Sequence, residues 1–387
     1  MRNFLILTTL LFTSLAQASR LHEVRSLLEN SVYACPDRIW KGVDWRAARI
    51  VLVSPSAGSG LILQHGQVET LSKVESEAFT TDYEIKNKSV TVNVDYAQSS
   101  ADAFALLVHE GFHAFGQDDF EQSTEGRTEI YPAKYEPRLE REELTRSLIS
   151  HFRGEAGALE KAAAWHRRHA SHKEQLGSDV IEGSAEYVEK VASVIAKLGC
   201  DVSEKVLVDQ AVEAIAEQGG AFDKEQEHYR IGALAFLLAR PQLQKVLSEI
   251  EDDFLPLDIV LRDVKHDDTI SPDTLLDHAA EMTVSIFNRK AEDVINPIKE
   301  HIAANKTLVF VPFKSLVGSF NHGGSFKAEE LVYFGNLEIT TSGGKLDGNG
   351  FNAKACGDQL GFMVVTDQKV EPTRQGDTYL NSNVICL

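Results

Sequence analysis

Residues 89–115 constrain this chain most, because they predict a β-strand followed directly by a helix that carries two histidines four positions apart. Ser89–Asp95 reads Ser-Val-Thr-Val-Asn-Val-Asp, an alternation rich in β-branched residues that is typical of a strand. Residues 101–115 have the apolar spacing of a helix, and the two serines before them can cap its first turn. The histidines are His109 and His113, which bound the pentapeptide His-Glu-Gly-Phe-His.

This H-E-x-x-H pattern predicts a metal site. Residues four apart on a helix share a face, so the imidazoles of His109 and His113 can reach one ion. Glu110 falls beside them, where its carboxylate can take a proton from water. Two neutral ring nitrogens and one further ligand leave a Zn²⁺ ion an open position for water and substrate. The pattern also arises by chance on amphipathic helices. The strand before it favours zinc, since this segment resembles the zincin metallopeptidases, in which such a helix follows a strand.

Residues 1–18 predict a cleavable secretory signal. Arg2 supplies the positive start, and Phe4–Leu15 is an apolar core of 12 residues, too short to span a bilayer. Ala16–Ala18 is a small-x-small cleavage site, so the mature chain is expected to begin near Ser19. No cysteine follows that site and no later apolar run reaches membrane length. We therefore expect a secreted or periplasmic protein without a membrane span.

Composition narrows the classes of partner. The chain holds 58 acidic and 39 basic residues, a formal net charge of −19, which disfavours binding to nucleic acid and to anionic membranes. Its even number of cysteines favours disulfides in an exported chain, with three connectivities possible. The positions favour a Cys35–Cys200 bond and a Cys356–Cys386 bond. The sequence has no C-x-x-C, which argues against a cysteine zinc site.

The pattern of apolar residues predicts an α+β protein with two domains. Residues 19–304 are expected to form a mostly helical, zincin-like domain with a small N-terminal sheet. Residues 305–387 are expected to form a β-rich C-terminal domain, because short β-like runs there alternate with Gly, Asn and Asp turns. Within the first domain we expect helices over residues 19–48 and 139–303, and strands at residues 49–54 and 61–64.

Two candidates compete for the third zinc ligand, and the first is Glu182. It lies in the segment Ile-Glu-Gly-Ser-Ala-Glu-Tyr, which ends at Tyr187 and continues with helical apolar spacing. Glu182 and Glu186 share one side of that helix. One of them could bind the metal while the other orients a ligand histidine through its second ring nitrogen. This arrangement resembles the gluzincins, in which a glutamate on a second helix is the third ligand.

The resemblance extends over residues 85–245. Some exported bacterial gluzincin-like proteins have H-E-x-x-H, a helical insert with an acidic Arg/Glu/Leu helix, an E-G-x-A-x-Y helix and a later Tyr-x-x-Gly helix. Matching segments here are Arg138–Leu144, Glu182–Tyr187 and Tyr229–Gly232. The resemblance implies a zinc peptidase with Glu182 as ligand and Glu186 supporting a ligand histidine. The gap before Glu182 is much longer than in thermolysin-like enzymes.

The second candidate is Asp119. The sequence from His109 also fits H-E-x-x-H-x-x-G-x-x-D, a variant of the metzincin signature in which Gly116 would let the chain turn back to the metal. Metzincins also need a Met-turn, and only Met282 and Met363 lie downstream, of which Met282 is in a helical pattern. Five other carboxylates remain as further candidates: Glu125, Glu129, Glu140, Glu142 and Glu143.

These observations lead us to expect an exported zinc metallopeptidase that acts on peptide or protein substrates. Glu110 is the expected general base, and Tyr187, Tyr229 or a histidine is the expected donor to the reaction oxyanion. Two alternatives remain open. One is an inactive zinc-bearing scaffold whose β-rich tail is a binding module, and the other is a zinc hydrolase of non-peptide amides.

Overall fold

The structure, a computed structural model, describes residues 19–386 apart from short gaps. These gaps are residues 80, 87, 118–119, 121–128, 175, 251–254, 267–268, 322–323, 342–343, 357–358, 367–373 and 380–381. The expected signal lies outside the described residues. The chain is an α+β protein that divides into two compact units. Unit 1 comprises Met1–Gly126 and Glu140–Ser271, and unit 2 comprises Arg127–Leu139 and Pro272–Leu387.

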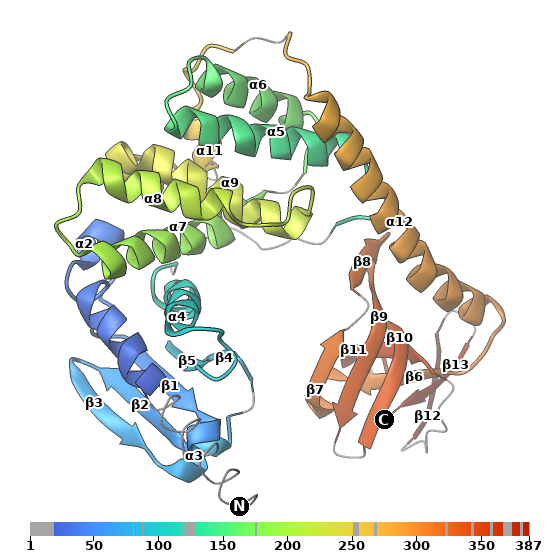
Figure 1. Cartoon of the computed structure of the whole chain (residues 1–387). Coiled ribbons are helices and arrows are strands. Elements are labelled where there is room, and N and C mark those ends of the chain that lie inside the picture. Colours follow the sequence, from blue (N-terminus) through green and yellow to red (C-terminus); the bar gives the residue numbers. More distant parts are fainter. Residues whose placement is uncertain are drawn as a thin grey trace, which may run out of the picture. The chain divides into compact units, whose positions relative to one another are not determined.

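Unit 1 contains a five-stranded sheet with the order β3-β2-β1-β5-β4 (Figure 1). Its strands are β1 (Arg49–Ser54), β2 (Ser59–Gln64), β3 (Gln67–Leu71), β4 (Tyr83–Ile85) and β5 (Ser89–Asn93). The predicted strands β1, β2 and β5 are confirmed, whereas β3 and β4 were not expected. The short helices η1 (Pro55–Ala57) and α3 (Lys73–Glu77) connect these strands.

The predicted helix over residues 19–48 is shorter than expected. A helix covers residues 19–30 and buries Val24 and Leu28, and turns follow it. Only the single turn α2 (Pro36–Ile39) is helical beyond that point. A proline disfavours the helical conformation of the residue before it, which explains why the first helix does not run on into α2.

Helix α4 (Ser100–Phe115) carries the H-E-x-x-H pattern and follows β5, as predicted. The side chain of Ser99 caps it by accepting a hydrogen bond from the amide of Asp102. Its apolar face, which includes Phe104, Leu107 and Phe112, is buried in the main core and packs beside β5. The apolar spacing, the serine cap and the buried apolar face therefore all favour a helix at this position.

The predicted helical region beyond residue 139 is confirmed as a series of helices. In unit 1 these are α5 (Tyr135–Phe152, which begins in unit 2), α6 (Ala158–Ala170), α7 (Gly177–Leu198), α8 (Glu204–Ala216), α9 (Lys224–Ala239), η2 (Arg240–Gln242), α10 (Leu243–Ile250) and α11 (Pro256–Val260). Helix α7 packs against α4, α8 and α9. No helix within the described ranges is both long and apolar enough to cross a membrane.

Helices α7 and α9 approach each other unusually closely at two glycines. A Cβ atom added to Gly183 would lie 2.3 Å from the Cα atom of Gly232, and one added to Gly232 would lie 2.1 Å from the carbonyl oxygen of Asp179. Both glycines belong to the segments on which the gluzincin resemblance rests. Their lack of a side chain brings the two helices into backbone contact.

Unit 2 combines one long helix with an eight-stranded sheet. The elements are α12 (Thr274–Ala303), β6 (Leu308–Pro312), η3 (Phe313–Ser315), β7 (Leu316–Asn321), β8 (Ser325–Ala328), β9 (Leu331–Thr341), β10 (Gly344–Ala355), β11 (Gln359–Val365), β12 (Arg374–Tyr379) and β13 (Ser382–Cys386). The sheet order is β12-β13-β6-β11-β10-β9-β7, and β8 pairs with β9. The β-rich character expected beyond residue 305 is thus confirmed.

The contact boundary of unit 2 differs from the expected domain boundary at residue 305. Helix α12 belongs to unit 2 because its buried residues, among them Ile295 and Ile298, share a core with strand residues such as Phe310. The segment Arg127–Leu139 belongs there too. The amide of Tyr131 donates to the carbonyl of Lys327 in β8.

A disulfide joins Cys35, next to α2, to Cys200 at the end of α7. This is one of the two bonds that the cysteine positions favour. Cys356 is also disulfide-bonded. The side chain of Cys386, its expected partner, lies outside the described side chains.

Candidate metal centre

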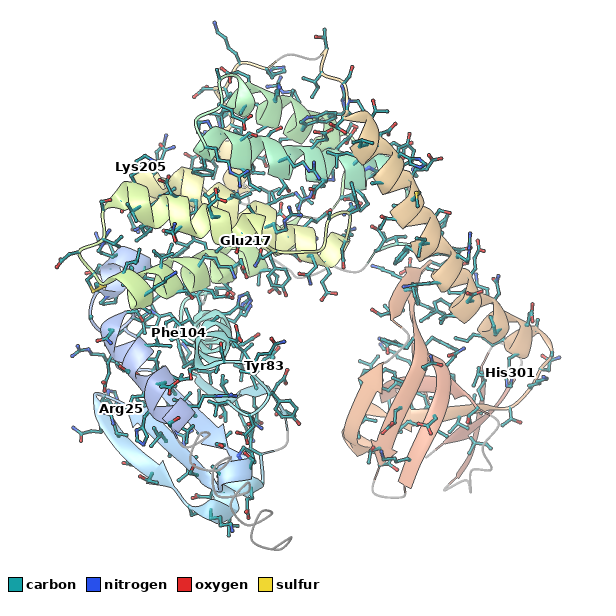
Figure 2. All side chains as sticks on the ribbon, in the orientation of Figure 1. Arg25, Tyr83, Phe104, Lys205, Glu217 and His301 are labelled. Atoms are coloured by element: carbon teal, nitrogen blue, oxygen red, sulfur yellow. A yellow bond between two sulfur atoms is a disulfide. The ribbon has the colours of Figure 1, made fainter. Side chains whose placement is uncertain are left out.

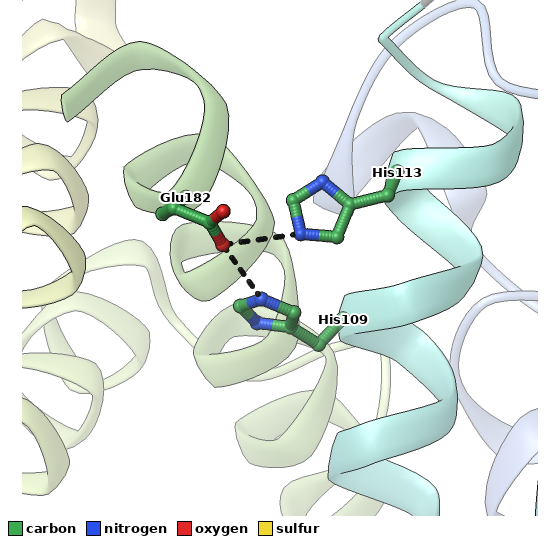
Figure 3. Close-up of side chains that lie close together, drawn as sticks. All are labelled: His109, His113 and Glu182. Carbon is green, nitrogen blue, oxygen red and sulfur yellow. Dashed lines mark ion pairs between the residues drawn. The ribbon is translucent and has the colours of Figure 1, made fainter. Parts of the chain in front are cut away.

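His109 and His113 of α4 and Glu182 of α7 come together in unit 1 (Figure 3). The Nε2 atom of His109 lies 3.6 Å from Oε2 of Glu182, and Nε2 of His113 lies 3.3 Å from the same oxygen. His109 and Glu182 are buried, and the side chain of His113 is 17% exposed. Of the two candidate third ligands, Glu182 is therefore brought to the histidines.

These separations fit a zinc ion. Ligand atoms bound tetrahedrally at about 2.0–2.1 Å lie roughly 3.3–3.4 Å apart. The two nitrogen–oxygen distances of 3.6 and 3.3 Å are close to that spacing. Two imidazoles with one carboxylate are also a donor set of catalytic zinc sites, which keep a fourth position open.

The second ring nitrogen of each histidine has its own hydrogen-bond partner. Nδ1 of His109 lies 3.2 Å from Oε2 of Glu189, and Nδ1 of His113 lies 2.7 Å from Oε1 of Gln117. Such partners fix the ring orientation and leave Nε2 as the atom that faces a metal. Glu186, the expected support, is more distant, with Oε2 3.6 Å from Nδ1 of His109.

Glu189 and Gln117 were both missed by the sequence reasoning. Glu189 follows Glu182 and Glu186 at the i, i+4, i+7 spacing of one helix face, a signal that could have identified it. Gln117 follows α4, where the only signal is its position four residues after His113.

Lys190 forms ion pairs with the two carboxylates that lie near Nδ1 of His109, those of Glu186 and Glu189. Nζ of Lys190 lies 2.8 Å from Glu186 and 2.6 Å from Glu189. Burial opposes ionisation of Glu189, yet the hydrogen bond with His109 and the charge of Lys190 lower the pKa of Glu189 to about 2. Burial likewise lowers the pKa of His109, but its hydrogen bonds with Glu182 and Glu189 raise that pKa to about 10. His109 therefore lies between two carboxylates, with Glu182 near Nε2 and the ionised Glu189 near Nδ1.

Glu110, the expected general base, lies beside the histidines and not among the three converging groups. Burial raises its pKa and outweighs the charges of His109 and His113. Glu110 also has a hydrogen bond with Tyr83, whose side chain projects from the edge strand β4 (Figure 2). Tyr83 is 37% exposed, so it connects Glu110 to the protein surface. No strand was expected at Tyr83, and the sequence reasoning therefore missed it.

The two tyrosines expected as oxyanion donors lie in different places. The ring of Tyr229 lies against His109, with 5.6 Å between the ring centroids. Tyr187 is not brought to the site. Its ring packs on Trp40 and Phe236, and its hydroxyl accepts a hydrogen bond from Arg240. Tyr187 follows Glu182 by five positions, which places it roughly 140° around α7.

Most of the other candidates for the third ligand pair elsewhere or lie outside the described residues. Asp119 and Glu125 lie outside the described residues. Glu129, Glu140 and Glu142 pair elsewhere, with Arg138, with His172, and with Arg146 and Arg230 respectively. Within the described ranges, Glu143 is not part of any group that could hold a metal ion.

Comparison with protein families, with curated proteins and with solved structures finds no match to this chain. The geometry of the site and the motif resemblance therefore remain as indications of its chemistry.

Proposed function

We propose that this protein is a zinc-dependent peptidase of gluzincin type, with His109, His113 and Glu182 as the zinc ligands. One observation carries the proposal. Both Nε2 atoms face a single carboxylate oxygen at the spacing of tetrahedral ligands. Both Nδ1 atoms have hydrogen-bond partners of their own, as they do in ligand histidines. Zinc held there would lower the pKa of water toward neutrality and polarise a carbonyl group.

Glu110 serves as the general base in this proposal. It neighbours a ligand in sequence but lies outside the converging triad, so its carboxylate is free to handle protons. Burial raises the pKa of Glu110, which brings the carboxylate closer to the range in which a group can both take and return a proton. Its Oε atoms would accept the proton of the attacking water and deliver it to the leaving amine. The hydrogen bond with Tyr83 would hold the carboxylate in place.

The edge strand β4 supports a peptide as the substrate. It is the last strand of its sheet on the side next to α4, and all three of its residues are exposed. An exposed edge can pair with an extended chain through main-chain hydrogen bonds. Tyr83 joins this edge to Glu110, so a chain paired there would pass close to the base. Tyr229 would stabilise negative charge that develops beside His109.

The proposal also includes export of the protein from the cytoplasm. The apolar segment and cleavage site in residues 1–18 predict a secretory signal. The disulfide between Cys35 and Cys200 supports an oxidising compartment, where such bonds form and persist.

The test combines zinc analysis with a peptide-library cleavage screen on the mature protein. We expect about one zinc per chain in wild type and loss of zinc in Glu182→Ala. Glu110→Gln should keep zinc and lose cleavage, and Asp119→Ala should keep zinc. Zinc lost with Asp119→Ala alone would move the third ligand to that residue. A wild-type protein without zinc after reconstitution, or with zinc but no peptide cleavage, would refute the proposal.

A further inference from the structure

Gln117 contacts both halves of the candidate zinc site with one side chain. Its Oε1 atom lies 2.7 Å from Nδ1 of His113 in α4. Its Nε2 atom lies 2.5 Å from the carbonyl oxygen of Ile181 and 2.8 Å from Oγ of Ser184, both in α7. Ile181 and Ser184 flank Glu182 in sequence. The amide therefore links a histidine ligand on one helix to the turn of the other helix that carries the carboxylate ligand.

The orientation of this amide follows from its partners. A main-chain carbonyl can only accept a hydrogen bond, so the Gln117 atom that faces Ile181 must be the NH₂ group. The hydroxyl of Ser184 donates to the same Ile181 carbonyl, at 3.2 Å, which leaves its oxygen to accept from Gln117. Both contacts on α7 thus require the NH₂ group, and the amide oxygen is left facing His113.

This orientation determines the tautomer of His113. An amide oxygen accepts hydrogen bonds and donates none, so Nδ1 of His113 must carry the hydrogen. In the neutral ring the lone pair is then on Nε2, the atom that lies 3.3 Å from Glu182. His109 is held differently, since the ionised carboxylate of Glu189 is the partner of its Nδ1 atom.

The steric setting of Gly116 helps to place Gln117. Helix α4 ends at Phe115, and Gly116 follows with a φ angle of −111°. A Cβ atom at Gly116 would lie 2.2 Å from the ring of Phe112. The glycine is therefore required by this close approach, and not by a left-handed backbone. It lets the chain pass over Phe112 so that Gln117 lies back against His113.

We propose that Gln117 is a positioning residue that fixes the metal-binding tautomer of His113 and holds α4 in register with α7. This inference rests on the proposed zinc site. It predicts that zinc affinity depends on a neutral side chain that is not itself a ligand. Removal of an outer partner of a ligand histidine usually weakens metal binding by about 10–100-fold.

The first test measures the zinc dissociation constant of the full mature protein by competition with a chelating dye. Gln117→Leu keeps the approximate volume of the side chain and removes all three hydrogen bonds, so we expect about 10–100-fold weaker binding. Ser184→Ala removes only one contact on α7 and should weaken binding less. Gln244→Leu, at an exposed glutamine of α10, is the matched control and should bind zinc as wild type does. Affinity of Gln117→Leu within about threefold of wild type would overturn the proposal.

The second test needs no variant and no metal. Nitrogen-15 chemical shifts of His113 in chelator-treated wild-type protein report which ring nitrogen carries the hydrogen of the neutral ring. We expect the hydrogen on Nδ1, and a predominant Nε2–H form would overturn the proposal. A wild-type protein that binds no zinc would refute the proposed function, while the shift measurement would still test the tautomer of His113 that this inference requires. Wild-type zinc binding with an unaffected Gln117→Leu variant would refute this inference alone.

Discussion

Substitution of Gly183 by alanine tests the helix crossing that brings Glu182 into place. An alanine in a helix interior is normally favoured over glycine by about 0.8–1 kcal/mol. Without the crossing, Gly183→Ala should therefore stabilise the protein. The sign of the change in unfolding free energy is diagnostic, because only a steric conflict at this position can reverse it.

The magnitude follows from the contact that the new methyl group would make. Its carbon would lie 2.3 Å from the Cα atom of Gly232, whereas ordinary contacts begin near 3.4 Å. The obstacle is backbone, which cannot rotate away, so α7 and α9 must separate by roughly 1 Å. Overpacking of this kind costs about 1–3 kcal/mol, and a backbone obstacle favours the upper end of that range. After the helix preference is subtracted, we expect a net loss of about 2 kcal/mol.

Thermal unfolding of the chelator-treated protein measures this loss. A change of about 2 kcal/mol should lower the melting temperature by roughly 4–8 °C for a unit of this size. Zinc affinity should fall as well, since Gly183 adjoins Glu182 in α7. Gly219→Ala is the control, because a Cβ atom there meets nothing within 4 Å and no positive φ angle is involved. Its stability should stay within about 0.5 kcal/mol of wild type. A Gly183→Ala variant as stable as wild type, or more so, would refute the reasoning.

Three further predictions concern the groups around the proposed zinc ligands. Glu189→Leu should weaken zinc binding about 10–100-fold. Glu189→Gln should weaken it much less, because the amide oxygen can still accept a hydrogen bond from Nδ1 of His109. Equal zinc affinities of the two variants in a chelator competition would contradict this. Tyr83→Phe should retain zinc and lower kcat about 10–100-fold with little change in KM, since it removes the hydrogen bond that would hold the Glu110 carboxylate in place. A kcat within twofold of wild type would exclude that role. Zinc affinity should rise about tenfold per pH unit between about pH 7 and 9. The reason is that the pKa of His109 is raised from 6.5 to about 10, so zinc must displace a proton from this imidazole in that range. A zinc affinity that does not change with pH would argue against this linkage.

The sequence predicts best what is decided locally. Helix α4 has apolar periodicity, a serine cap and a strand before it, and all three signals are contained within residues 89–115. The i, i+4 spacing of His109 and His113 then follows from helix geometry alone. Glu182 was identified through a motif resemblance, because the 69 positions that separate it from His113 carry no local signal of proximity.

What the sequence could not predict depends on tertiary contacts. Gln117 contacts Ile181 and Ser184 of α7, which lie 64 and 67 positions further along the chain. Tyr83 is in a strand of three residues, too short for an alternation to be recognised. The misplacement of Tyr187 was avoidable, since a residue five positions after Glu182 lies on another side of the helix. For α12, periodicity predicted the helix but not the sheet whose core it completes.

The segment Arg127–Leu139 gives unit 2 a discontinuous chain. The side chain of Asn288 donates to the carbonyl of Ala133 and accepts from its amide, which joins residues 155 positions apart. During synthesis from the amino end, the residues of this segment that contact Asn288 and Lys327 remain without these partners until α12 and β8 have been made. Non-local pairing of this kind slows folding and prolongs exposure to aggregation and proteolysis. Expression of unit 1 alone would therefore require removal of an internal stretch as well as the C-terminal region.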